Sequence, residues 1–398
     1  MIEPYYGEFL INPIPLELSL NFCSHKCGYC FANLNNPGRK LNAPRLMRFL
    51  ADYRNRDTLP ATLLKAGYPV VMSNRVDPFA NSNFQQTLPI LELLAQLGIP
   101  VQFQTRGGKG IEDALKIVGP SVWYVSITFQ DDAQRRAVEP GAPSIPARLD
   151  LISQLTDHGH HVVAGLNPLV PDWIPDPEPL LDQIQAAGAW GVWIERLHLN
   201  TDQIKNMSDR EQDAIGQDLL AAARRRKCAP AHEAHITRAR DYATGLGLHV
   251  YSVGQPVYSD FFDIYHRTYP ATFPTMQDWI NYCYRTYMPG DIISFNDFSE
   301  FMTPHLPHGQ HRISHYLGAT ARTLWKQYHI PNEMTYRQLL GILWDQPTIK
   351  TGIAKSNNFA YAAQRDNENL TVLIDDIDEL PYMVFLPWVE NYYMEVEV

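Results

Sequence analysis

Apolar runs of strand length alternate with helical patterns between Leu16 and Leu197, and this alternation most constrains the fold. It predicts parallel strands joined by βα units, hence an α/β fold with a partial, TIM-like (β/α)6 barrel. The predicted strands cover residues 16–22, 68–72, 100–104, 122–129, 160–166 and 191–197, and the predicted helices cover 43–56, 81–97, 110–118, 143–158 and 179–188. Ligands of such sheets bind at the carboxyl ends of the strands, so functional side chains are expected there.

The regular alternation stops after Leu199. A barrel domain is therefore expected over residues 1–200, followed by a C-terminal α+β domain over 201–398 that serves as a substrate-recognition domain or a cap. Three helices and three strands predicted near 296–390 are compatible with a winged-helix-like module. Residues 296–373 carry seven Lys and Arg against six Asp and Glu, so they lack the basic patch that is typical of a nucleic-acid-binding surface.

The loop after the first predicted strand contains Cys23, Cys27 and Cys30 in a C-x3-C-x2-C spacing. Thiolates hold iron–sulfur clusters, and a four-iron cluster normally needs four of them. A cluster held by only three leaves one iron open to a ligand. A zinc site completed by His25 is the alternative metal site, whereas five cysteines in 398 residues argue against a disulfide framework.

This motif, which includes the aromatic Tyr29 just before the last cysteine, resembles that of radical S-adenosylmethionine (SAM) enzymes. The resemblance implies a 4Fe–4S cluster on Cys23, Cys27 and Cys30 whose open iron binds SAM. It implies reductive cleavage of SAM to a 5′-deoxyadenosyl radical that abstracts hydrogen from a substrate. The cofactors supply this chemistry while the protein orients them, and the resemblance also implies a flavodoxin- or ferredoxin-type electron donor.

Polar residues and a glycine follow the second to the fifth predicted strands, where the resemblance places SAM. The candidate cofactor-binding residues are Tyr29, Ser73, Asn74, Asp77, Gln104, Arg106, Ser126, Thr128, Gly165 and Asn167. Arg106 could pair with the SAM carboxylate, and the hydroxyl groups of Ser126 and Thr128 could reach the ribose. An Asx turn made by Asn74 or Asp77 is the structural alternative after the second strand. Glu195 and Arg196 lie in the sixth strand, where structural ion pairing is an equal alternative to a substrate contact.

A narrower resemblance is to the spore-photoproduct-lyase-like (DNA repair photolyase-like) branch. It is carried by Asp77-Pro78, by Glu139-Pro-Gly-Ala-Pro143 through Arg148, and by Asn167-Pro168-Leu-Val-Pro171. It implies a nucleic-acid base or nucleotide as substrate. The true lyase has a hydrogen-donating cysteine shortly after the cluster motif, and residues 73–82 contain none. The alternatives are modification of a peptide or small metabolite, and a non-enzymatic iron–sulfur sensor of redox state or iron with a DNA-binding C-terminal module.

Tyr282 and Cys283 lie in a tyrosine-rich segment and are candidates for a catalytic hydrogen relay, although a lone cysteine among aromatic residues is more often a buried small hydrophobe. His305, His308, His311 and His315 suggest a second metal site only weakly. The net charge of −10 argues against broad phosphate binding. We expect a cytoplasmic protein without a membrane span, because cluster thiolates require a reducing compartment and no apolar run is long enough to cross a bilayer.

Overall fold

A computed structural model of the chain describes the region from Val76 to Leu197 without a gap and other segments in part. The described residues are 2–3, 17–18, 20, 22–30, 42–56, 59–65, 67, 69–72, 76–197, 199, 204–205, 207–224, 230–252, 282–283, 285–288, 290–302, 363–364, 373–374 and 381–385. The chain divides into two compact units. The first contains residues 1–2, 17–53 and 69–252, and the second contains 3–16, 54–68 and 253–398.

An eight-stranded sheet forms the centre of the first unit, and its strands lie side by side in the order of the sequence. From β2 onward each strand pairs in parallel with the next. The strands are β1 (Ile2–Glu3), β2 (Glu17–Leu18), β3 (Val70–Met72), β4 (Val101–Thr105), β5 (Val122–Ser126), β6 (His161–Leu166), β7 (Gly191–Ile194) and β8 (His249–Tyr251). Because β1 and β8 are the two edges, the sheet is open, and the predicted α/β fold with a partial barrel is confirmed.

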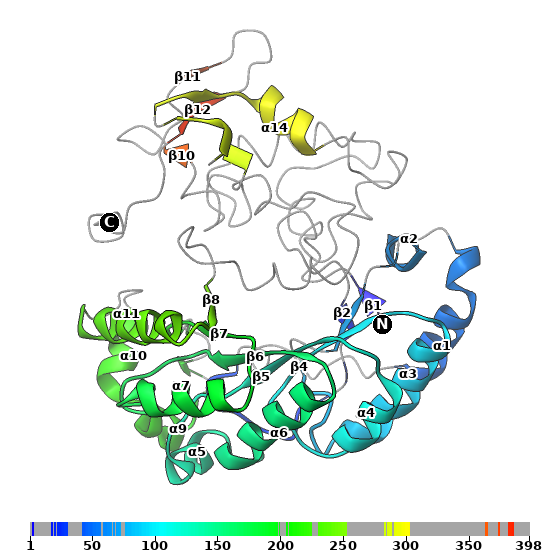
Figure 1. Ribbon diagram of the computed structural model, residues 1–398, viewed down its shortest axis with the longest axis horizontal. Helices are drawn as coiled ribbons and strands as arrows, with labels where there is room; N and C mark the ends of the chain where they lie inside the picture. Colours follow the sequence, from blue (N-terminus) through cyan, green and yellow to red (C-terminus); the bar gives the residue numbers. More distant parts are fainter. Residues whose placement is uncertain are drawn as a thin grey trace. The chain divides into compact units, whose positions relative to one another are not determined.

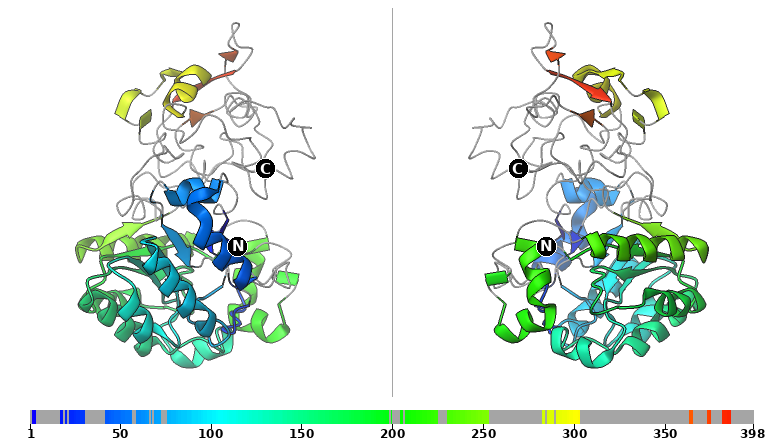
Figure 2. Two further views of the ribbon diagram at one scale, coloured as in Figure 1. Left: turned by 90° about the vertical axis from the view of Figure 1, so that its right-hand side faces the viewer. Right: turned by 90° about the vertical axis from the view of Figure 1, so that its left-hand side faces the viewer.

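The helices that connect these strands lie along one side of the sheet (Figure 1), and Figure 2 shows the same arrangement from two further sides. The helices of this unit are α1 (Ala43–Asp52), α3 (Phe84–Gln96), α4 (Ile111–Ile117), α5 (Asp132–Val138), α6 (Ile145–Asp157), α7 (Pro177–Ala186), α9 (Asp209–Ile215), α10 (Gln217–Arg224) and α11 (Pro230–Gly245). Side-chain caps fix several of their starts. Asp131 accepts the Ala133 N–H at 2.7 Å before α5, and Ser144 accepts the Ala147 N–H at 3.4 Å before α6.

Aromatic rings from neighbouring strands pack together in the buried core. Phe103 on β4 stacks on Trp123 on β5 with ring centroids 3.9 Å apart, and Phe79 stacks on Trp123 at 5.5 Å. All three side chains are fully buried. Burying rings of this size stabilises a fold by about 2–3 kcal/mol each, so this cluster is a large part of what ties β4 and β5 to the loop after β3.

Several element boundaries differ from the sequence-based predictions. The strand predicted over 122–129 ends at Ser126, and Thr128 beyond its end hydrogen-bonds with Tyr29 and Glu139. A short helix, α5, lies where none was predicted. Residues 209–224 form two helices, α9 and α10, separated by Gly216, whose φ of 94° ends the first one.

The first unit extends beyond the predicted boundary at residue 200. β8 adds in parallel to β7, and α11 packs on α7, on β7 and on β8, so residues up to Ser252 belong to the sheet unit. These additional elements bury apolar surface that the six-strand pattern leaves uncovered. None of the described helices is long and apolar enough to cross a membrane.

The second unit contains α2 (Leu59–Lys65), α14 (Phe295–Met302) and a small antiparallel sheet. In this sheet β12 (Pro381–Phe385) pairs with β9 (Ile292–Ile293), β10 (Ala363–Gln364) and β11 (Leu373–Ile374). The described C-terminal part is therefore α+β, as predicted. Most of the segment that suggested a winged-helix-like module, including the four histidines from His305 to His315, lies outside the described residues.

Candidate active site at the carboxyl ends of the strands

The cysteine loop, residues 22–30, follows β2 and docks on residues 138–142. The Gly28 N–H donates to the Val138 carbonyl at 2.9 Å, and the Gly141 N–H donates to the His25 carbonyl at 3.0 Å. A Cβ atom at Gly141 would lie 2.2 Å from the Ser24 carbonyl oxygen. Only glycine allows the two backbones to approach this closely, so the Glu139-Pro-Gly turn is shaped to hold the cysteine loop.

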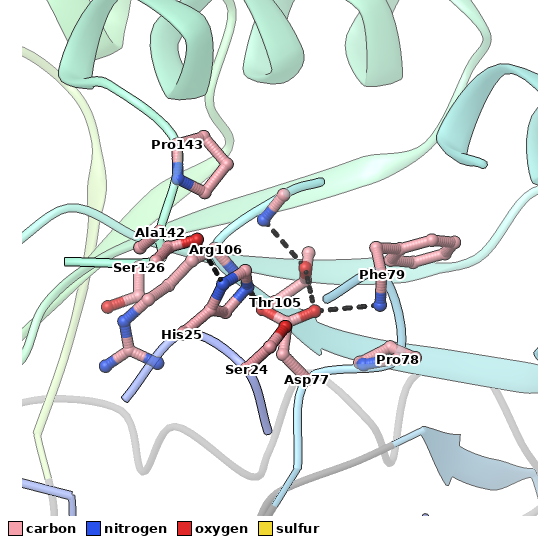
Figure 3. Close-up of polar contacts among 12 residues, drawn as sticks. Ser24, His25, Asp77, Pro78, Phe79, Thr105, Arg106, Ser126, Ala142 and Pro143 are labelled. Atoms are coloured by element: carbon pink, nitrogen blue, oxygen red, sulfur yellow. Dashed lines mark hydrogen bonds and ion pairs between the residues drawn. The ribbon is translucent and has the colours of Figure 1, made fainter. Parts of the chain in front are cut away.

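His25 lies between the Gly141 carbonyl and the Asp77 carboxylate (Figure 3). Its Nδ1 lies 2.9 Å from the Gly141 carbonyl oxygen, and since a carbonyl only accepts, Nδ1 carries the proton. Its Nε2 lies 3.1 Å from Asp77 Oδ2. Both ring nitrogens therefore face other groups, and His25 is not oriented to serve as the fourth ligand of a zinc ion.

Asp77 connects three loops at this edge of the sheet. Its Oδ1 accepts the Phe79 N–H at 2.9 Å and the Thr105 hydroxyl at 2.8 Å, and its Oδ2 accepts the Arg106 N–H at 2.6 Å. Burial would raise the pKa of Asp77, but His25 and these N–H donors outweigh burial and lower it. The bond to Phe79 is the Asx turn anticipated as the structural alternative, and the carboxylate is occupied by protein donors.

Tyr29 is anchored inside the protein by its phenol. The hydroxyl donates to Glu139 Oε1 in a short hydrogen bond and lies 3.1 Å from Thr128 Oγ1. Thr128 in turn donates to Glu139 Oε1 at 2.9 Å. Burial raises the pKa of Tyr29, so the phenol is neutral. Thr128 and Tyr29 thus use their hydroxyl groups to fix the cysteine loop.

Glu139 is fully buried between two arginines. Arg106 Nε donates to Oε1 at 3.0 Å, and Arg148 Nη2 makes a short contact to Oε2. Burial alone would raise the pKa of Glu139, but the charges of Arg148 and Arg106 lower it well below its ordinary value. We call Tyr29, Arg106, Thr128, Glu139 and Arg148 the Glu139 network.

The cysteines of the loop remain thiols and are not joined in disulfides. Burial, with the Asp77 carboxylate, raises the pKa of Cys23 to about 11. Burial also raises the pKa of Cys27. The Arg106 charge lowers this pKa, and the other two cysteines of the loop raise it. A bound metal would offset these raised values, because coordination stabilises the thiolate.

In the described part of the chain, no three His, Cys, Asp or Glu side chains form a group suited to a single metal ion. A four-iron cluster makes a different demand, because each of its thiolates binds a separate iron and the sulfurs need not converge on one point. Cys23, Cys27 and Cys30 supply three thiols from one loop, which is the type of donor that such a cluster takes.

Three of the remaining predicted cofactor residues, Gln104, Ser126 and Gly165, lie on one face of the sheet. Strand register places Gln104 beside Tyr124 and Ser126 beside Gly165. Gln104 is 9% exposed, and its Nε2 has no hydrogen-bond partner. Ser126 is buried, and its carbonyl accepts from Arg148 Nη1 at 2.9 Å. Asn167 is half-buried before a cis peptide bond to Pro168, while the predicted residues Ser73 and Asn74 lie outside the described residues.

A side chain of the protein fills the space next to Gly165. A Cβ atom there would lie 1.8 Å from the Tyr124 phenol oxygen, so the Tyr124 ring occupies the space that the missing side chain leaves. Tyr124 also packs edge-on against Trp193, with ring centroids 5.5 Å apart. The close approach to Gly165 that was expected of the cofactor is therefore made by the Tyr124 side chain.

Glu195 and Arg196 both form ion pairs. Glu195 is buried, accepts from the Ser252 hydroxyl at 2.5 Å and lies 3.5 Å from Arg240 Nη2. Arg196 is partly exposed and contacts Glu233 at 3.1 Å. These contacts agree with the structural alternative given for the sixth strand.

The proposed relay residues belong to the second unit. Cys283 is fully buried, and burial raises the pKa of its thiol. The Tyr282 ring packs against Phe301 with centroids 4.9 Å apart and lies edge-on to Tyr287 at 6.2 Å. Such packing is typical of structural residues, and the relay remains a prediction.

Two residues central to the geometry, Glu139 and Arg148, were not among the sequence candidates, and His25 was considered only as a zinc ligand. Glu139 and Arg148 were noted only as parts of a motif. A carboxylate before a Pro-Gly turn, with an arginine nine residues later in the next helix, was the available signal. Their pairing became visible only in three dimensions.

No protein-family model matches the sequence. An uncharacterized protein of Mycobacterium tuberculosis is 30% identical over 217 residues, which cover 48% of this chain and 63% of that protein. An uncharacterized protein of Acidianus two-tailed virus is 24% identical over 213 residues, 48% of this chain and 71% of that protein. The chain thus spans less than two thirds of its mycobacterial relative.

A relative from Pseudomonas phage M6, named radical SAM Nalpha-GlyT isomerase, is 25% identical over 274 residues, or 62% of this chain and 54% of that protein. Among solved structures, Streptococcus suis SuiB bound to S-adenosylmethionine is similar with a TM-score of 0.42 and 16% identity, covering 88% of this chain and 68% of SuiB. Methylornithine synthase PylB gives a TM-score of 0.34 and 13% identity over 59% of this chain and 70% of PylB. These structural similarities are weak.

Proposed function

We propose that this protein is a radical SAM enzyme in which Cys23, Cys27 and Cys30 hold a 4Fe–4S cluster. The observation that carries the proposal is the cysteine loop: three thiols within eight residues, fixed by buried contacts at the carboxyl end of a parallel strand. The resemblance of this motif and the name of the phage relative support the same chemistry. When bound, the cluster and SAM would supply radical abstraction of hydrogen from a substrate.

Under this proposal, the residues of the candidate site have one of two roles: they hold the loops in place or they bind SAM. Tyr29, Asp77, Thr128 and Glu139 use their polar atoms on one another and on backbone groups, so they hold the cysteine loop and the adjoining loops. The residues left for SAM are Ser73, Asn74, Gln104, Arg106, Ser126 and Asn167, since Tyr124 fills the space at Gly165. Within this second group, the buried and unpartnered Gln104 Nε2 favours a ligand acceptor near β4.

Arg106 retains donors for an anion. Its Nε and Nη2 engage Glu139 and Tyr29, which leaves Nη1 and the outer N–H of Nη2. These two donors form the end of the guanidinium fork, a geometry that suits a carboxylate. The side chain is 22% exposed, so part of it is accessible to a ligand such as the SAM carboxylate.

The first test compares wild-type protein with Cys23→Ala, Cys27→Ala and Cys30→Ala after anaerobic reconstitution with iron and sulfide. We expect the wild type to bind four irons per chain, to show the electron paramagnetic resonance signal of a reduced cluster, and to form 5′-deoxyadenosine from SAM with dithionite. Each loop variant should lose all three properties, whereas Cys283→Ala, outside the loop, should retain them. A wild-type protein that binds zinc, or a cluster that yields no 5′-deoxyadenosine, contradicts the enzyme proposal, and the latter result supports the sensor.

For the substrate we propose a nucleic-acid base or nucleotide. Support comes from the lyase-like motifs around Asp77, Glu139 and Asn167. Nucleic-acid oligomers and nucleotides should stimulate SAM cleavage, whereas peptide mixtures and metabolite extracts should not. Stimulation by peptides alone would contradict this proposal and leave the radical chemistry intact.

If Cys283 is the hydrogen relay, Cys283→Ala should cleave SAM but fail to form product. The proposed electron donor is a flavodoxin or ferredoxin.

A further inference from the structure

Three hydrogen bonds and one ring contact hold Arg106 in place. Its backbone N–H donates to Asp77 Oδ2 at 2.6 Å, its Nε donates to Glu139 Oε1 at 3.0 Å, and its Nη2 donates to the Tyr29 hydroxyl at 2.9 Å. The guanidinium carbon also lies 5.6 Å from the centre of the Tyr29 ring. These contacts fix the positive charge next to the cysteine loop.

The Glu139 network carries a net positive charge. Two guanidinium charges, on Arg106 and Arg148, face the single carboxylate of Glu139, so one positive charge remains. Arg148 is fully buried behind Glu139, whereas Arg106 lies on the side of the cysteine loop. Arg106 reaches the cysteine loop at the Tyr29 hydroxyl, next to Cys30 in the sequence, and besides Glu139 the opposing carboxylate in the contacts described is Asp77, whose Oδ2 accepts the Arg106 backbone N–H.

We propose that Arg106, oriented by Glu139 and Tyr29, is the fixed charge that stabilises the reduced form of the iron–sulfur cluster on the cysteine loop. The inference rests on the proposed function. Reduction transfers one electron from the donor to the cluster and adds one negative charge, with no bond made or broken. A positive charge held nearby favours that state, and screening is weaker at a largely buried site than at the surface. Net charge, hydrogen bonds and exposure are the factors that set the potentials of such clusters.

The test is a redox titration of the reconstituted protein without SAM, followed by the electron paramagnetic resonance signal of the reduced cluster. Arg106→Met removes the charge and should shift the midpoint potential to a more negative value. Arg106→Lys keeps the charge and should restore most of that shift. Arg238→Met removes an exposed arginine of the same unit and should leave the potential unchanged.

Glu139→Gln gives an independent test of the opposite sign, since removing the carboxylate leaves more positive charge and should shift the potential to a more positive value. A full cluster with the wild-type potential in Arg106→Met overturns the inference while the proposed function stands. A loss of SAM affinity at unchanged potential also overturns it and assigns Arg106 to the SAM carboxylate. A wild-type protein that holds no cluster overturns both.

Discussion

Replacing Glu139 by Gln tests how much the first unit depends on its buried charges. Glu139 receives hydrogen bonds from Thr128 and Tyr29 and from both arginines of the network. A glutamine is nearly the same size and still accepts hydrogen bonds, but it lacks the negative charge. Arg148, whose side chain is 0% exposed, would then remain charged inside the protein without the carboxylate that neutralises it, although the Ser126 and Pro143 carbonyl oxygens would still accept its hydrogen bonds.

The expected loss of stability follows from this geometry. Removing one partner of a buried ion pair costs about 3–5 kcal/mol, because the other charge is left without compensation. This is a large part of the roughly 5–15 kcal/mol by which a domain is stable. For a domain of this size class it corresponds to a fall in the melting temperature of roughly 6–20 °C.

The loss of stability caused by Glu139→Gln depends on pH. The arginines lower the pKa of Glu139 in the folded protein, so the folded state binds fewer protons here than the unfolded state does. The stability gained from Glu139 is therefore fully present above the unfolded carboxyl pKa of about 4.3 and is lost as the pH falls below it. The difference between wild type and Glu139→Gln should shrink as the pH is lowered below about 4.

The assay is thermal and urea unfolding of anaerobically purified protein at pH 7 and at lower pH, followed by circular dichroism. Glu178→Gln is the matched control: Glu178 pairs with Arg238 at 2.8 Å on the surface and should change stability by less than about 1 kcal/mol. If Glu139→Gln is as stable at pH 7 as this control, the buried pair does not stabilise the fold, and the reasoning is refuted.

Three further predictions concern single sites. Gly165→Ala should lower stability by about 1–3 kcal/mol in urea unfolding, because its Cβ would meet the Tyr124 phenol 1.8 Å away, whereas Gly119→Ala, with open space around it, should not. Gly141→Ala would place a Cβ 2.2 Å from a carbonyl of the cysteine loop and should reduce iron bound after reconstitution; unchanged iron content would contradict the docking of the loop. Burial lowers the pKa of His160 to about 4, so stability should decline as the pH falls from about 6.5 toward that value, and His160→Gln should make this decline smaller.

The alternation of strands and helices was readable from the sequence because each element buries a continuous apolar face. The runs that became β4, β5 and β6 are fully buried apart from His161, and such runs are recognisable without tertiary information. The extent of the unit was less predictable. β8 is three residues long, and only its pairing with β7 shows that it belongs to the same sheet.

In the candidate site, too, the local features could be predicted from the sequence and the long-range contacts could not. The cysteine spacing is local, so the sequence alone identified Cys23, Cys27 and Cys30 as a candidate ligand set. The contacts that hold this loop join residues more than a hundred positions apart, as in the bonds from Tyr29 to Glu139 and from His25 to Gly141. A sequence pattern does not show which distant carboxylate or carbonyl a side chain will meet. The sequence thus determined the βα architecture and the candidate cluster motif, whereas tertiary structure decided which polar residues hold that motif, since a buried charge must find its partner in space.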